Sequence, residues 1–380
     1  MSRLLRRASV GAAILGLVAV GALRAQTEPV PGIDNTAFGT TSAEFLLLGA
    51  GARGAALGNS FAALATDPTA LYWNPAGLAE MPRPGVTIST YDYLADTRYS
   101  WGGLAFPFGG GQSAIGVQIG TFGFSDQPVY TLNDPEGDGT TYGVSETFVG
   151  LTYARNFSDR FSAGITGKFI SDRLGKTDAT AIAVDFGTSF HALIGGRPIR
   201  ASFVVANLGS GLQHTGVGLD VNVERQPPPG QQQIPQDPQP SRYQSEAFGL
   251  PVVFRVGLAY DFVNTTASRV TLTSSFSQPN NSNATAGGGL ELALSDIGQT
   301  GFSVVARGSY TYQPDNDFAQ AATPDAGFAT ALSSDEDLDG LALGGGLGYS
   351  RGSFYLGLDY AYRHLGILGG TNVFSATVYW

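Results

Sequence analysis

Histidine is the residue type through which this sequence could do acid–base or metal chemistry, because the chain contains three histidines and no cysteine. His191, His214 and His364 lie far apart, and neither an H-E-x-x-H nor a G-x-S-x-G motif is present. Ser189 would share a strand face with His191, but the sequence supplies no orienting third group for a catalytic Ser–His pair. We therefore predict no catalytic residue, no metal site and no cofactor.

A glycine-rich string, Gly49-Ala-Gly51-Ala-Arg-Gly54, matches the pattern G-x-G-x-x-G, and Asp67 follows at about the distance of a ribose-binding acid. The fingerprint is informative only within a strand–helix–strand unit. Here a proline and then an Asn-Pro pair follow Asp67, and no second strand does. We interpret these glycines as sites of close backbone packing.

Two acidic runs have a spacing that calcium loops use. Residues 335–340 (DEDLDG) supply oxygens at alternate positions and a glycine for the turn, but the twelfth position is Gly346 and not the expected glutamate. Asp134, Glu136 and Asp138 repeat the spacing. We expect solvated external loops here, with calcium binding as the alternative.

Other charged residues follow a period of two. From Phe354 to Arg363, leucine and aromatic residues occupy the even positions, whereas Tyr355, Asp359 and Arg363 stand among small residues at the odd positions. This alternation indicates strands with one apolar face. Small residues mixed with charges of both signs are typical of a barrel lumen. The predicted lumen charges are Lys168, Asp185, Arg255, Asp261, Glu291, Arg307, Asp359 and Arg363.

Strand length distinguishes two architectures that share this pattern. A soluble sandwich has strands of about 5–6 residues, whereas a membrane barrel needs about 9–11 or more, as the alternating runs here provide. We therefore predict an all-β fold, a transmembrane antiparallel β-barrel of about 14 strands over residues 85–380. The predicted strands lie near 85–93, 97–108, 112–124, 143–156, 160–172, 179–193, 198–208, 251–263, 268–277, 284–295, 300–313, 340–351, 353–364 and 371–380.

The connections support the barrel, because bacterial barrels have short periplasmic turns and long external loops. If the first strand runs outward, the long connections 125–142, 209–250 and 314–339 are all external. The run from Gln226 to Pro240 is rich in proline and glutamine, so we expect a flexible or extended loop. The last strand ends in Trp380, which resembles the C-terminal insertion signal of outer-membrane barrels; the alternative is an edge strand of a soluble sheet.

The N-terminal residues 1–25 are predicted to be a signal peptide, with three arginines, an apolar stretch from Ala8 to Leu23 and a small residue, Ala25, for cleavage. A membrane anchor is the alternative, but the stretch is short for one. Removal of this segment leaves 17 basic against 31 acidic residues, a net charge of −14. Such a chain should repel nucleic acid.

Residues 26–84 form a lead-in and a segment rich in small residues that resembles the N-terminal region of the PorV/PorQ family of outer-membrane proteins, which belongs with the FadL-like barrels. The string Tyr72-Trp-Asn-Pro-Ala-Gly-Leu78 is the most specific part of the resemblance. The resemblance implies a fourteen-stranded barrel with a small N-terminal plug (hatch). The residues that match this plug motif are Gly51, Arg53, Gly58, Asp67, Pro68, Tyr72, Trp73, Asn74, Pro75 and Gly77.

Short helices would fit this plug. Asp67 can cap a helix that has Pro68 at its first position, and Asn74-Pro75 would end it. A soluble N-terminal subdomain is the alternative. Arg53 is the one charge within a long stretch of small residues, and either meets a lumen carboxylate, with Asp185 and Asp359 as candidates, or lies solvated at the periplasmic rim.

Two functions remain open at this point. The resemblance implies a protein-interaction role in the outer membrane, in which the barrel receives exported cargo or hands it on as part of type IX-like secretion. The alternative is FadL-like transport of hydrophobic small molecules. The expected partners are accordingly outer-membrane lipid, proteins of a secretion or assembly machinery, and an apolar small-molecule ligand.

Overall fold

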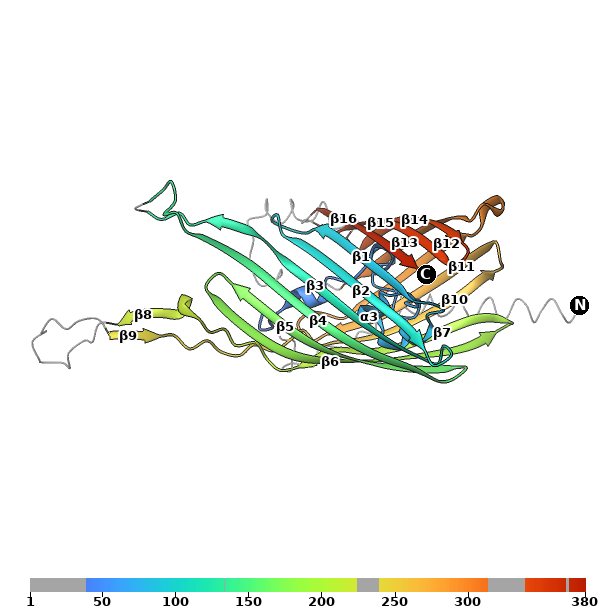
Figure 1. Cartoon of the computed structure of the whole chain (residues 1–380), viewed down its shortest axis with the longest axis horizontal. Coiled ribbons are helices and arrows are strands. Elements are labelled where there is room, and N and C mark those ends of the chain that lie inside the picture. Colours follow the sequence, from blue (N-terminus) through green and yellow to red (C-terminus); the bar gives the residue numbers. More distant parts are fainter. Residues whose placement is uncertain (1–38, 133, 224–238, 314–338, 367–368) are drawn as a thin grey trace, which may run out of the picture. The chain divides into compact units, whose positions relative to one another are not determined.

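The computed structural model describes residues 39–132, 134–223, 239–313, 339–366 and 369–380. The expected signal peptide, the lead-in 26–38, most of the Pro- and Gln-rich run and most of the acidic run 335–340 lie outside these residues. In the described part, fourteen antiparallel strands form a closed barrel (Figure 1). They are β1 (Gly85–Asp92), β2 (Arg98–Phe108), β3 (Ser113–Pro128), β4 (Thr141–Ser158), β5 (Phe161–Leu174), β6 (Thr177–Ile194), β7 (Arg197–Gly209), β10 (Val253–Asn264), β11 (Ser268–Pro279), β12 (Thr285–Leu294), β13 (Phe302–Tyr312), β14 (Leu341–Arg351), β15 (Phe354–His364) and β16 (Gly370–Tyr379).

The barrel closes between its first and last strands, with Gly85 opposite Tyr379 and Thr90 opposite Phe374. Every predicted strand is present, and the sequence prediction of a fourteen-stranded barrel is confirmed. Several strands are longer than predicted, and in one case Gln127 and Pro128 of β3 still pair with Tyr142 and Thr141 of β4. The apolar alternation stops before this point, but backbone hydrogen bonds continue the ladder without it. Residues 125–128 and 141–142 of the predicted loop 125–142 are therefore strand.

The apolar face of each strand points outward. Leu151 is 63% exposed whereas Thr152 beside it is completely buried, and Ile182 is 66% exposed between the buried Ala181 and Ala183. A soluble sandwich would bury these leucine and isoleucine side chains. The outward apolar face is what a bilayer requires.

Aromatic side chains pair at the end of the barrel that carries the short turns. Trp380 packs edge-on against Phe106, with ring centroids 6.1 Å apart, and Phe302 lies 4.9 Å from Tyr349. Trp380 is 47% exposed on the outer face. This position matches the aromatic belt that marks a membrane interface.

The connection between β7 and β10 folds back on itself. It includes the short helix η4 (Val217–Leu219) and a two-stranded ribbon of β8 (Asp220–Val223) and β9 (Gln239–Arg242), which extends away from the barrel (Figure 1). Nearer the barrel, Leu212 and Phe248 pair as an isolated bridge. We call the end of the barrel with this connection the external end, and the end with the short turns the periplasmic end.

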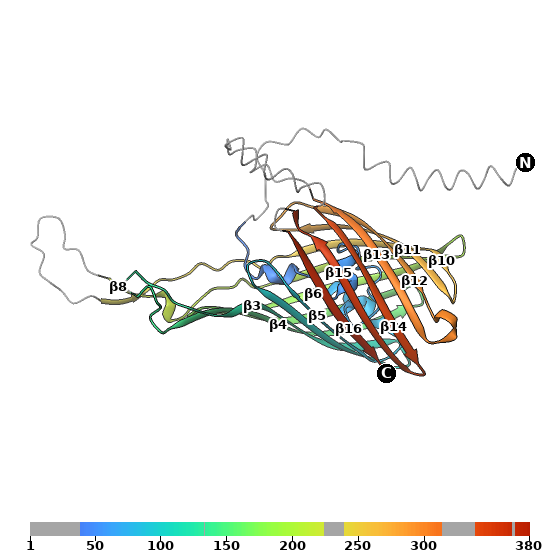
Figure 2. The same ribbon diagram turned by 90° about the horizontal axis from the view of Figure 1, so that it is seen from above.

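Residues 41–81 lie within the barrel (Figure 2), and we call them the lumen segment. It contains the short helices η2 (Glu44–Leu47), α2 (Ala52–Ala56), α3 (Ala70–Trp73) and η3 (Pro75–Glu80). Most of its side chains are buried, including Phe61, Leu64 and Trp73. A further helix, η5 (Ile297–Gln299), forms the turn between β12 and β13. Among the described residues, no helix has both the length and the apolar character that a membrane span requires.

Candidate functional site

The lumen segment fits its narrow space through residues that lack a side chain. A Cβ on Gly77 would lie 1.8 Å from the carbonyl oxygen of Ala65, and one on Gly54 would lie 2.7 Å from the indole of Trp73. Neither position can hold a larger residue without displacing a neighbour. The interpretation of these small residues as sites of close packing therefore agrees with their geometry.

Gly51 and Gly58 flank α2 and tie it to the wall. The Gly51 amide donates to the Ser89 hydroxyl on β1 (3.2 Å), and the Gly58 carbonyl accepts from the Thr311 hydroxyl on β13 (2.7 Å). The barrel closes between β1 and β16, so β1 and β13 hold α2 from the two sides of this seam.

Tyr72 and Trp73 brace the beginning of the lumen segment. The Tyr72 hydroxyl donates to the Leu46 carbonyl (2.9 Å) and accepts from the Gly49 amide (3.0 Å), and Trp73 donates to the Ala50 carbonyl (2.7 Å). Burial raises the pKa of Tyr72, so its hydroxyl stays protonated and can donate.

Arg255 on β10 lies over both of these rings. Its guanidinium is 5.7 Å from the ring centroid of Tyr72 and 5.6 Å from that of Trp73. Within the part of the chain that the structure describes, no ion pair is formed by Arg255 or by Arg363, which faces the lumen beside Tyr91 and Trp73. Arg255 is therefore stabilised mainly by the aromatic faces, a cation–π arrangement.

Asn74 ends α3 and links the segment to the wall. Its side chain accepts from the Ala76 amide (3.1 Å) and donates to the carbonyls of Ala62 and Thr188 (both 3.2 Å). Pro75 then begins η3, where its missing N–H leaves no donor unpaired. The predicted end of the helix at Asn74-Pro75 agrees with the structure.

Asp67 and Pro68 do not cap α3 in the predicted way. The helix begins at Ala70, and its N-cap is Thr69, which makes no side-chain cap bond. The Asp67 carboxylate instead accepts from the Thr69 amide (2.9 Å) and from Arg53. The expected cap is wrong for two reasons. The Asp67 carboxylate also binds the Arg53 guanidinium, and Pro68 and Thr69 form a turn before the helix begins at Ala70.

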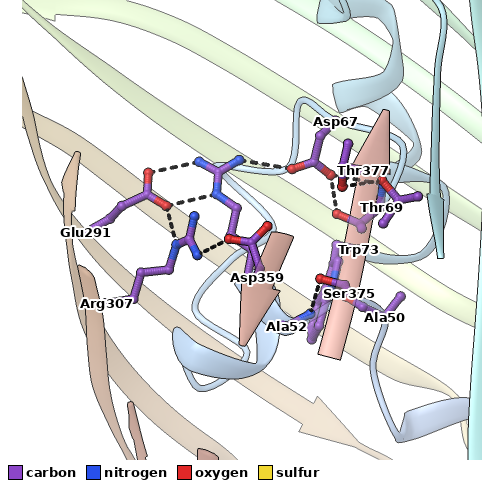
Figure 3. A network of polar contacts seen from close by, with 12 residues as sticks. Ala50, Ala52, Asp67, Thr69, Trp73, Glu291, Arg307, Asp359, Ser375 and Thr377 are labelled. Atoms are coloured by element: carbon purple, nitrogen blue, oxygen red, sulfur yellow. Dashed lines mark hydrogen bonds and ion pairs between the residues drawn. The ribbon is translucent and has the colours of Figure 1, made fainter. Parts of the chain in front are cut away.

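Arg53 forms the centre of a charged cluster that we call the charged anchor: Arg53, Asp67, Arg269, Glu291, Arg307 and Asp359. Figure 3 shows Arg307 of this cluster with its contacts to Glu291 and Asp359. The Nε and Nη2 of Arg53 donate to the two carboxylate oxygens of Glu291 on β12 at 2.8 and 2.9 Å, and its Nη1 donates to Asp67 at 2.9 Å. Glu291 is 1% exposed. The sequence candidates Asp185 and Asp359 are therefore not its direct partners.

Two wall arginines complete the charged anchor. Arg307 donates to Glu291 (2.8 Å) and to Asp359 (2.5 Å), and Arg269 donates to Glu291 (2.9 Å). Glu291 thus accepts four hydrogen bonds from three guanidinium groups. Asp359 is linked to Arg53 through Arg307 and Glu291.

Other lumen charges pair separately. Arg200 on β7 donates to Asp261 on β10 (2.9 Å). Lys168 lies 2.6 Å from Asp185, and both are almost completely buried. The structure thus divides the predicted lumen charges among the charged anchor, these two pairs, and the two arginines described above.

Four polar residues near the periplasmic end form ion pairs that the sequence pattern did not predict. Arg200 and Arg269 are described above, and Glu80 at the end of η3 lies 2.7 Å from the imidazole Nε2 of His191. Arg269 has the same strand parity as the inward Thr271 and Thr273, so alternation alone could have found it. Nothing in the sequence joins Glu80 to His191, which is 111 positions away.

The His191 contacts do not form a catalytic triad. Ser189 and Glu80 both approach the same nitrogen, Nε2, at 3.1 and 2.7 Å. A triad uses the two ring nitrogens for different partners.

Two of the acidic positions considered for calcium, Asp134 and Asp138, contact neighbouring hydroxyl groups. The Asp134 amide donates to the Thr131 hydroxyl, and Asp138 accepts from the Thr140 hydroxyl. In the described residues, no three acidic or histidine side chains gather closely enough to hold a metal ion.

Two cavities open toward the periplasmic end. One of about 590 Å³ is bordered by the charged anchor and by Asp296 and Gly352 of the short turns. The other, about 680 Å³, is bordered by Glu80, His191 and Arg155. Both are lined largely by polar groups, so they suit water better than an apolar molecule.

Comparison with known proteins places this geometry in a family. The family model described as "Type IX secretion system protein PorV" matches residues 33–222, half of the chain. No curated protein sequence matches.

Solved structures share the fold at low sequence identity. The Ralstonia pickettii toluene transporter TbuX is 13% identical with a TM-score of 0.51, covering 88% of this chain and 98% of that one. A deletion mutant of the TodX monoaromatic hydrocarbon channel is 11% identical with a TM-score of 0.50, covering 87% and 98%. With its barrel, outward apolar face and family match together, the chain belongs to the PorV family of type IX secretion system proteins, and it is an outer-membrane β-barrel with a FadL-like fold.

Proposed function

We propose that this barrel is a protein-interaction component of type IX secretion, which receives exported cargo or hands it on, and that residues 26–84 contribute a plug that keeps its lumen shut. The observation that carries the proposal is the charged anchor, in which a buried carboxylate on the wall holds the lumen segment by two hydrogen bonds. A barrel that serves as a scaffold needs a closed lumen, and this contact supports closure.

The inward apolar side chains also favour a scaffold. Phe148 on β4 lies 6.0 Å, centroid to centroid, from Phe45 of the lumen segment. Val204 and Val253 pack with Ala62 of the same segment. These side chains would be candidates for an apolar transport path, but the lumen segment covers them.

The external end carries apolar side chains that lipid would not cover there. Tyr243, Val217 and Leu132 are exposed on the connections beyond the barrel strands. Large exposed apolar side chains in water often mark protein contact surfaces. We place partner contact on the β7–β10 connection, where Val217 and Tyr243 lie.

A pull-down from native outer membranes in mild detergent tests this role. Recovery of a large outer-membrane translocon, or of its cargo, is the expected result. The double variant Val217→Ser/Tyr243→Ser should lose these partners while the barrel stays folded. Ile297→Ser, an exposed apolar position on the turn between β12 and β13 at the opposite end, is the matched control. Full retention of all partners by the double variant would count against this surface.

Closure of the lumen is tested by conductance in planar bilayers. The intact protein should conduct poorly, and deletion of residues 36–80 should raise its conductance, because the segment that fills the lumen is then missing. Equal conductance of the two proteins would contradict the plug.

Transport of hydrophobic small molecules is the second candidate. The fold likeness to a protein described as a toluene transporter favours it. If the pull-down yields the barrel alone, with a reproducible apolar ligand in the lipid-soluble fraction, transport replaces the scaffold role.

A further inference from the structure

The lumen segment is attached at both ends of the barrel. At the external end, the Ser42 amide donates to the Gly249 carbonyl (2.9 Å), and Thr41 and Gly249 form a parallel bridge. Gly249 belongs to the long connection between β7 and β10. At the other attachment, Arg53 pairs with Glu291 beside the cavity that opens toward the periplasmic end.

These two attachments are separated by a short path along the chain. Ser42 and Arg53 are eleven positions apart. Backbone groups in between are held by fixed partners at close intervals: the Tyr72 hydroxyl binds Leu46 and Gly49, Trp73 binds Ala50, Ser89 binds Gly51, and Ser375 binds Ala52. These bonds lie so close together that the stretch can leave its place only if they break together, so it is held or released as one unit.

The remainder of the lumen segment is fixed more firmly. A Cβ on Gly187 of β6 would lie 2.2 Å from the Asn74 side chain, and one on Gly164 of β5 would lie 2.5 Å from the backbone of Pro75. The wall and η3 are thus in direct backbone contact. Arg53, in contrast, borders the polar cavity of about 590 Å³, which leaves space into which its guanidinium can move.

We propose that residues 41–53 couple the external connection to the periplasmic cavity, as one element with two states. In the first state, both the Gly249 bridge and the Arg53–Glu291 pair are formed. In the second state, both are broken, while residues 74–80 stay in place. A partner that draws Gly249 away would thereby open the charged anchor, and release of Arg53 would in turn loosen the bridge, because coupling between two sites is reciprocal.

This coupling goes beyond the proposed function, and it holds or fails whatever the partner is. The chain has no cysteine, so a single introduced cysteine reports on one position. The experiment measures the maleimide labelling rate of the Ser42→Cys variant in the purified full-length protein, with and without Arg53→Met. We expect Arg53→Met to speed the labelling of the thiol introduced at position 42 about fivefold or more.

The matched control is Arg269→Met, which removes another guanidinium from Glu291 without touching the lumen segment. It should leave the labelling rate at position 42 close to that of the Ser42→Cys parent. An unchanged rate in Arg53→Met, or an equal rise in Arg269→Met, would overturn the proposal.

A second cysteine position distinguishes coupling from unfolding. Ser60 is 3% exposed and binds Ser275 on the wall. A Ser60→Cys reporter should stay unreactive in the Arg53→Met background if only residues 41–53 move. Fast labelling of both the Ser42→Cys and the Ser60→Cys reporters would mean that the whole segment has come loose, and would likewise overturn the proposal.

Discussion

Arg53 and Glu291 face each other across the lumen with two parallel hydrogen bonds, 2.8 and 2.9 Å long, although they are 238 positions apart in the sequence. One belongs to a helix inside the barrel and the other to a wall strand. This two-point geometry fixes the orientation of both groups as well as their distance. The pair therefore sets where the lumen segment lies against β12.

Glu291→Gln should destabilise the folded barrel. The amide group would direct its own N–H donors toward guanidinium donors, and three buried or half-buried arginines would lose their shared carboxylate. We expect a loss of about 3–5 kcal/mol in the free energy of unfolding. A urea titration followed by tryptophan fluorescence measures it. Asp92→Asn breaks the exposed pair with Arg98 and should not change the midpoint measurably.

Asn74→Asp should weaken the contact between the lumen segment and β6. The Asn74 side-chain NH₂ now donates to the carbonyls of Ala62 and Thr188. In the variant, a carboxylate oxygen would face these two carbonyl oxygens with no hydrogen to share. The expected loss is about 1–3 kcal/mol or more in the same titration. Asn222→Asp on the exposed ribbon is the control. A midpoint shift of the same size in both variants would contradict this role of Asn74.

Gly77→Ala should be poorly tolerated because its Cβ would lie 1.8 Å from the Ala65 carbonyl oxygen. We expect a loss of about 1–3 kcal/mol from the forced displacement of the backbone. Gly167→Ala on β5 is matched to it, since a Cβ there meets no atom within 4 Å. Equal midpoints for the two alanine variants would show that the close approach at Gly77 carries no cost.

Trp380→Ala should lower the amount of assembled barrel in outer membranes. The reason is the expected role of this residue as an insertion signal, together with its place on the outer face beside Phe106. The measurement is the folded fraction in membrane extracts at matched expression. Phe302→Ala removes another outward aromatic at the same end and should have a smaller effect. Equal losses in the two variants would reduce Trp380 to an ordinary member of the aromatic belt.

The inward orientation of the lumen charges could be predicted from the sequence, but their partners could not. Alternation put Lys168, Asp185, Glu291 and Arg307 on the inward face, and the structure agrees for each of them. Their partners did not follow from it. Lys168 meets Asp185 because strand register brings neighbouring strands β5 and β6 into alignment, with Thr166 opposite Asp185. A shift by one residue would have turned either side chain outward.

The sequence by itself determined the barrel. Its apolar residues alternate with a period of two, and the alternating runs are long enough to cross a bilayer. These properties are local, so the apolar face of each strand can be predicted from that strand alone. The tertiary structure alone decided which carboxylate holds Arg53, how the glycines of the lumen segment meet the wall, and that Thr41 reaches Gly249. These contacts join residues that are distant in the chain, and they depend on how the closed barrel places its strands around the segment, which no local pattern encodes.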